Sequence, residues 1–141
     1  MVSALLDETL AAIASERGGG FNRSFSLASD LLAEYGEPRL AERLITDIPP
    51  TVPWEVVADL LGILSWTTSD NGSASFRTAE RWLREATDLR RILIALNLDV
   101  YPFLDSKEME RVLLRVADRH PEASGRCREL IAARRREGGG S

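Results

Sequence analysis

Apolar residues return every three or four positions along nearly the whole chain. A half-buried helix needs this spacing, because it must keep one face apolar over successive turns. Eight windows show the pattern, and glycine, proline or polar residues separate them. Strand-like alternation is confined to residues 98–101, which are too few to build a sheet. The sequence therefore predicts an all-α fold.

Signals for helix ends mark several boundaries between the windows. The first helix is expected to end near Arg17, before the glycines at 18–20. Ser26 is expected to cap the second helix, which Gly36 stops. Pro38 is expected to occupy the first position of the third helix, where its missing N–H does no harm.

Two of the windows, residues 54–64 and 89–96, are apolar on almost every side. A helix with almost no polar face is expected in the middle of a structure. Between these two, residues 76–86 form a helix with one apolar face and with Trp82 at the margin of that face. Two further helices follow, and Pro121 begins the last of them.

Short connections between the windows favour antiparallel neighbours. We therefore expect a single compact antiparallel array of about eight helices, or a short stack of helical hairpins. The chain has 141 residues, of which 44% are hydrophobic and 28% charged, a size and composition typical of one soluble domain. We place that domain at residues 1–137 and interpret residues 138–141 as a flexible Gly/Ser tail.

The start of the chain and its charge predict the compartment and exclude some partners. The N-terminus lacks the basic start and long apolar run of a secretory signal, so a cytoplasmic protein with no membrane span is expected. Eighteen basic and twenty-two acidic side chains give a net charge of -4, which repels phosphate backbones. The arginines at 81–91 and 134–136 alternate with acids, as on salt-bridged solvated faces. We expect no nucleic-acid partner.

Groups suited to catalysis near neutral pH are scarce, since the chain has one histidine and one cysteine. His120 is expected at a helix N-cap, and Cys127 is expected as a small hydrophobic residue on an apolar face. Two such ligands are too few for a structural zinc site. Residues 70–72 match part of a calcium loop but lack its later glutamate, so a turn that caps the next helix is favoured. We expect no cofactor, no metal and no catalysis, unless several carboxylates converge in a cleft.

Antiparallel order also predicts which connections meet, because connections alternate between the two ends of such an array. The second, fourth and sixth connections are therefore expected at the same end of the array. Their residues form what we call the acidic rim. Its residues are Glu37, Trp66, Asp70, Asn71, Asp99, Tyr101 and Asp105. Carboxylates interleaved with aromatic side chains favour the capture of a basic protein surface.

Residues 53–103 combine a Trp-bearing helix that ends in an Asp-Asn-Gly turn with a second Trp helix. An aliphatic helix that closes on Asp99, Tyr101 and Phe103 follows. This third of the chain resembles the small helical immunity proteins that bacteria encode beside polymorphic or contact-dependent toxins. The resemblance implies tight, stoichiometric binding of a cognate protein toxin, such as a nuclease or deaminase, without chemistry. The alternative is a helical adaptor or a regulatory module that holds a small molecule between the two all-round apolar helices.

Overall fold

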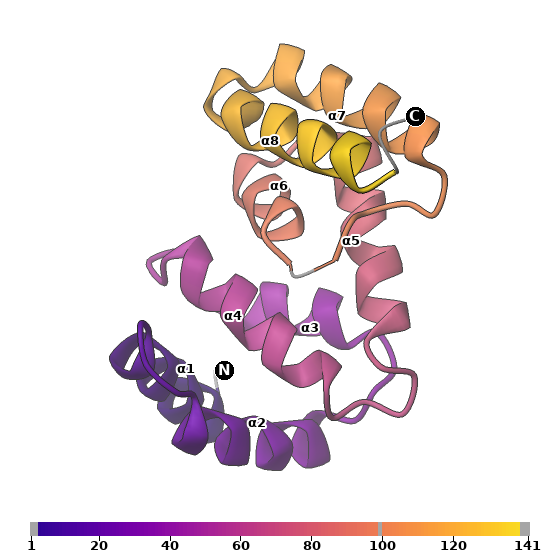
Figure 1. Cartoon of the computed structure of the whole chain (residues 1–141). Helices are drawn as coiled ribbons and strands as arrows, with labels where there is room; N and C mark the ends of the chain where they lie inside the picture. Colours follow the sequence, from indigo (N-terminus) through magenta and orange to yellow (C-terminus); the bar gives the residue numbers. More distant parts are fainter. Residues whose placement is uncertain (1–2, 99, 139–141) are drawn as a thin grey trace. The chain divides into compact units, whose positions relative to one another are not determined.

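The computed structural model describes residues 3–98 and 100–138, and their regular structure is entirely helical (Figure 1). The helices of the described residues are α1 (Ala4–Glu16), α2 (Asn22–Tyr35), α3 (Leu40–Asp47), α4 (Trp54–Ser65), α5 (Ser73–Glu85), α6 (Leu89–Leu96), α7 (Ser106–Arg119) and α8 (Pro121–Glu137). The predicted all-α class is confirmed. No helix in the described ranges has both the length and the apolar character that a bilayer crossing needs.

The chain divides into two compact units, an N-terminal unit of Met1–Thr78 and a C-terminal unit of Ala79–Ser141. The boundary falls within α5. Both the expectation of one domain over residues 1–137 and the expectation of antiparallel order stay predictions.

The core of the N-terminal unit forms around α4, which packs against α1 and α2 (Figure 1). The buried residues of α4 are Val56, Val57, Ala58, Leu60, Leu61, Ile63 and Leu64. Each fully buried aliphatic side chain of this size contributes roughly 1.5–3 kcal/mol relative to an exposed one. The apolar circumference of this helix is therefore matched by packing within its unit.

The start of α2 differs from the prediction, because α2 begins at Asn22, four residues before Ser26. The cap comes from the end of α1. The Glu16 carboxylate accepts hydrogen bonds from Arg23 N at 3.2 Å, from Ser24 N at 2.8 Å and from Ser24 Oγ. These bonds lower the pKa of Glu16, and the bond from Ser24 Oγ has the largest effect. A carboxylate at the end of the preceding helix thus makes a cap at Ser26 unnecessary.

The start of α3 also differs, since α3 begins at Leu40 and not at Pro38. Pro38 and Arg39 form a turn, in which Arg39 has a left-handed backbone with φ of 54°. Arg43 holds this turn through hydrogen bonds from Nε to Pro38 O at 3.0 Å and from Nη2 to Gly36 O at 2.9 Å. The prediction that Pro38 occupies the first helical position is wrong, because these bonds stabilise a turn there.

In the C-terminal unit, α7 and α8 pack side by side and α6 packs against α8 (Figure 1). The expected apolar positions of these two long helices are buried, among them Met109, Val112, Leu113, Val116, Cys127, Leu130 and Ile131. Trp82, expected at the margin of the apolar face of α5, is only 2% exposed, so burial extends to that margin. Trp82 and Leu83 point about 100° apart on the helix, and α5 buries an arc that includes both.

Candidate functional site

Two of the three connections assigned to the acidic rim lie side by side within the N-terminal unit. Glu37 belongs to the connection between α2 and α3, and Ser69 belongs to the connection between α4 and α5. Glu37 Oε2 accepts from Ser69 N at 3.1 Å, and Glu37 Oε1 accepts from Ser69 Oγ at 2.8 Å. These bonds join segments 32 residues apart and place Glu37 against the connection that carries Trp66, Asp70 and Asn71.

Asp70 caps the start of α5 from the preceding turn, as the interpretation of residues 70–72 as a capping turn predicted. Its Oδ1 accepts from Gly72 N at 3.0 Å, and its Oδ2 accepts from Ala74 N at 2.9 Å. The bond from Ala74, followed by those from Thr68 and Gly72, lowers the pKa of Asp70 despite partial desolvation. Asp70 is therefore ionised at neutral pH and held in a fixed position.

Trp66 is the C-cap residue that follows α4, and its backbone N donates to Ile63 O at 3.2 Å. Its side chain is 78% exposed, whereas Trp54 is half-buried and Trp82 is buried. It is the one exposed tryptophan in residues 3–98 and 100–138. A tryptophan held in water is unusual, because its ring contributes the most when it is covered.

The remaining residues of the predicted rim are distributed differently. Tyr101 and Asp105 belong to the C-terminal unit, and Asp99 lies outside the described residues. Asp105 caps α7 by accepting from Lys107 N at 3.0 Å. The Tyr101 hydroxyl donates to Glu137, and this hydrogen bond raises the pKa of Tyr101. The structure thus places Glu37 against the connection that carries Trp66, Asp70 and Asn71, and we call these four residues the Trp66 surface.

The rim carboxylates in the described part of the chain have structural partners. Glu37, Asp70 and Asp105 each accept a hydrogen bond from a backbone N–H. The sequence indicates Glu37 only as a charge available to a partner. It indicates Asp70 as such a charge and as part of a turn. The capping role of Asp105 is signalled by its place just before an apolar helix, but no sequence signal pairs Glu37 with Ser69. The Trp66 side chain, by contrast, is mostly exposed and holds none of these backbone groups.

His120 and Cys127 take the structural positions expected of them. His120 is the N-cap residue of α8, although its side chain does not cap the helix, and its Nε2 lies 2.9 Å from Ala86 O. Cys127 is buried, and burial raises the pKa of its thiol to about 11. Across the described ranges, no group of three or more His, Cys, Asp or Glu residues is arranged to hold a metal ion.

Several arginines on the solvated faces are paired with acids, as their alternation in the sequence indicated, whereas Arg134 donates to backbone carbonyls instead. Arg84 Nη2 lies 3.3 Å from Glu108 Oε2, and Arg91 Nε lies 3.7 Å from Asp88 Oδ2. Such exposed pairs contribute little to stability, but they reduce the net positive charge that these faces present.

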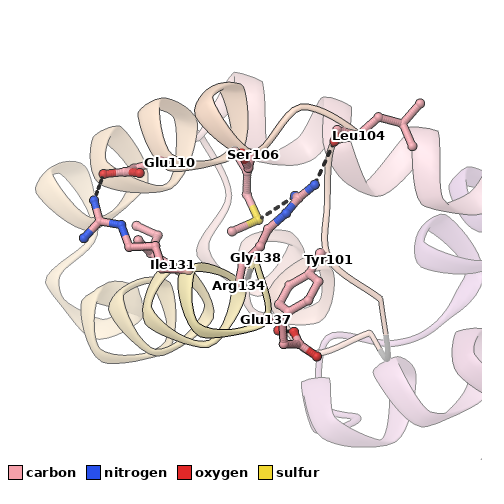
Figure 2. A pocket seen from close by; sticks show the side chains of 10 residues that line it. Tyr101, Leu104, Ser106, Glu110, Ile131, Arg134, Glu137 and Gly138 are labelled. Carbon is pink, nitrogen blue, oxygen red and sulfur yellow. Dashed lines mark hydrogen bonds and ion pairs between the residues drawn. The ribbon is translucent and has the colours of Figure 1, made fainter. Parts of the chain in front are cut away.

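A second feature, which sequence reasoning missed, is a pocket of about 630 Å³ in the C-terminal unit (Figure 2). It lies between the connection that precedes α7, the start of α7 and the end of α8. Its lining residues are Tyr101, Leu104, Ser106, Met109, Glu110, Ile131, Arg134, Arg135, Glu137 and Gly138. The small-molecule alternative expected a cavity between the helices at 54–64 and 89–96, and neither of these lines the pocket.

Comparisons of the chain with protein-family models, with curated proteins and with solved structures found no match. The function is therefore inferred from the residues and their geometry. Of the two features described above, the Trp66 surface is the one that combines an exposed aromatic side chain with fixed carboxylates.

Proposed function

We propose that the chain is a non-catalytic protein-binding domain that recognises a basic partner through the Trp66 surface. The observation that carries this proposal is the 78% exposure of Trp66 on a connection that is fixed by its neighbours. Tryptophan is among the residues that contribute most to protein interfaces, because covering its ring removes a large apolar area from water.

The connection that carries Trp66 is well ordered by its own hydrogen bonds. Glu37 holds Ser69 by two bonds, and Asp70 and Thr68 both accept from Gly72 N. A side chain displayed on such a segment loses little conformational freedom when a partner binds. This preorganisation favours binding over a purely structural role for the turn.

The charges beside Trp66 favour a cationic partner. The hydrogen bonds that lower the pKa of Asp70 keep its carboxylate ionised. A lysine or arginine of a partner that covers the indole face gains about 0.5–1 kcal/mol from an exposed cation–π contact. The ionised carboxylate of Asp70 belongs to the same connection, four residues after Trp66. The net charge of -4 also speeds the approach of a basic protein.

Within this class, we propose an immunity protein that blocks a cognate toxin. A toxin that acts on nucleic acid, such as a nuclease or deaminase, needs a cationic cleft for its substrate, and an acidic helical protein can occupy that cleft. The resemblance to immunity proteins covers residues 53–103, a stretch that includes both Trp66 and the 70–72 turn.

The experiment uses the protein encoded by the neighbouring reading frame as the candidate toxin. We expect one equivalent of this chain to abolish the toxin's activity, and we expect Trp66→Ala to weaken binding at least tenfold, or about 1.4 kcal/mol. The melting temperature of that variant should equal that of the parent, because Trp66 is mostly exposed. Binding is measured by calorimetric titration.

Phe25→Ala is the matched control, since it removes another exposed aromatic ring, 43% exposed, from α2 of the same unit. It should bind like the parent chain. Equal losses for both variants, or none for Trp66→Ala, would contradict the proposal. Asp70 is a poor target for this test, because its loss removes the cap of α5 and lowers stability as well.

A further inference from the structure

The C-terminal unit displays a leucine that has no packing role in the chain. Leu104 lies in the connection before α7 and is 100% exposed. Figure 2 shows its side chain directed away from Arg134 and from the backbone that Arg134 contacts. Leu104 also lines the edge of the 630 Å³ pocket. A contact that covers Leu104 and the pocket together would remove apolar surface from water.

The backbone that carries Leu104 is held in place by an arginine from α8. Arg134 Nη1 donates to Pro102 O at 3.2 Å and to Phe103 O at 2.8 Å, and Arg134 Nη2 donates to Leu104 O at 2.7 Å. The guanidinium also lies 5.5 Å from the centre of the Tyr101 ring. Three successive carbonyls are thus fixed by one side chain.

Phe103 adds a second anchor from α5. Its N donates to Glu80 Oε2 at 2.7 Å, and its buried ring lies 4.7 Å from the Arg84 guanidinium. Its φ of 66° is in the left-handed region, which a residue with a bulky side chain adopts only when its surroundings enforce it. Leu104 is therefore presented on a segment held from both sides, and little ordering is needed when it is covered.

The lining of the pocket beside Leu104 is apolar in part, and its charged members, which we call its rim, carry no net charge. Met109 and Ile131, both buried, contribute the apolar part. The charged lining residues are two carboxylates and two guanidinium groups, from Glu110, Glu137, Arg134 and Arg135. The rim is thus electrically balanced on a chain whose net charge is -4.

We propose that this surface is the interface of a symmetric dimer, in which Leu104 of each copy enters the pocket of the other. A two-fold axis brings the same patch of both copies together, so such a patch must carry a projection and a matching recess at once. This patch carries Leu104 and the pocket next to each other. Its balanced charges let a second negatively charged copy approach without repulsion at the contact. The neutral rim gives a basic partner, of the kind proposed for the Trp66 surface, no electrostatic preference for this site.

The test is sedimentation equilibrium of the full chain from about 1 µM to 1 mM, a range that spans weak to moderate association. We expect a monomer–dimer equilibrium for the parent chain and for Leu104→Met. Leu104→Asp should raise the dimer dissociation constant at least tenfold while leaving helicity and melting unchanged, because the side chain is fully exposed.

Leu114→Asp provides the matched control, because Leu114 is 45% exposed on α7 and does not line the pocket. It should dimerise like the parent chain. The proposal is overturned by a parent chain that stays monomeric at the highest concentration, by association beyond a dimer, or by Leu104→Asp and Leu114→Asp behaving alike. No toxin takes part, so failure here leaves the proposal for the Trp66 surface untouched.

Discussion

Gly72 shows how a single residue sets the geometry of the Trp66 surface. Its φ is 82°, and a Cβ added there would lie 2.6 Å from Ser65 Cβ and 3.1 Å from Phe76 Cζ. We predict that Gly72→Ala lowers the free energy of unfolding by about 1–3 kcal/mol, because the change adds both backbone strain and a clash. Urea denaturation measures the difference.

Gly125→Ala is the control for this prediction. Gly125 lies within α8, and nothing lies within 4 Å of the Cβ that the substitution would add. Alanine should therefore raise the free energy of unfolding by about 0.5–1 kcal/mol through helix propensity alone. If the two substitutions change stability in the same direction, the account of the turn at Gly72 is wrong.

Two capping carboxylates predict how stability depends on pH. The pKa values of Asp70 and Glu16 are lowered in the folded chain by the hydrogen bonds they accept. The unfolded chain therefore binds protons first as pH falls, so the stabilisation is complete above the ordinary carboxyl pKa of about 4 and is lost below it. Free energies of unfolding between neutral pH and pH 3 should show this decline, with a smaller slope in Asp70→Asn. An unchanged slope in that variant would contradict the role of Asp70.

At the scale of the element, α8 secures the connection before α7 through Arg134. We predict that Arg134→Ala lowers the free energy of unfolding by about 1–3 kcal/mol, because it leaves carbonyls of residues 102–104 without their donor. Arg134→Lys should recover only part of this loss, since an ammonium lacks the planar fork that reaches several acceptors. Chemical denaturation followed by circular dichroism measures both.

Arg136→Ala is the matched control, because the Arg136 side chain makes no hydrogen bond or ion pair within the part of the chain that the structure describes. Its effect should be within about 0.5 kcal/mol of zero. A loss as large as that of Arg134→Ala would assign the effect to charge at the end of α8 and not to the contacts of Arg134.

The same elements show what the sequence could predict. The helices follow from apolar spacing, which is a local pattern. The caps at Asp70 and Asp105 are also local, because each residue lies just before the helix that it caps. The starts of α2 and α3 were missed because Glu16 and Arg43 stabilise them from outside the expected cap positions. Local patterns do not carry information of that kind.

The candidate site divides in the same way. Counting connections predicted that Glu37 and the 66–71 segment would be neighbours, and the Glu37–Ser69 bonds place them so. The exposure of Trp66 and the pocket at Arg134 could not be predicted, because both depend on which side chains pack over distant residues. That Tyr101 and Asp105 belong to the same rim stays a prediction.

At the scale of the whole molecule, the two proposed surfaces differ in electrostatics and belong to different units. The Trp66 surface carries the carboxylates of Glu37 and Asp70, whereas the rim of the pocket beside Leu104 is charge-balanced. The two proposals thus assign to one chain an acidic contact for a basic partner and a neutral contact for its own copy. Association through the first should weaken as salt screens the charges, which separates the two contacts experimentally.

The three tryptophans allow the central claim to be tested in one measurement, because Trp66 is exposed, Trp54 half-buried and Trp82 buried. Fluorine NMR of chain labelled with 5-fluorotryptophan, with the Trp66 signal assigned from Trp66→Phe, is recorded while the neighbouring-frame toxin is added. We predict that the Trp66 signal shifts and loses its sensitivity to exchange of H₂O for D₂O, while the Trp82 signal stays in place. A stoichiometric complex in which the Trp66 signal remains unshifted and solvent-sensitive would contradict the account.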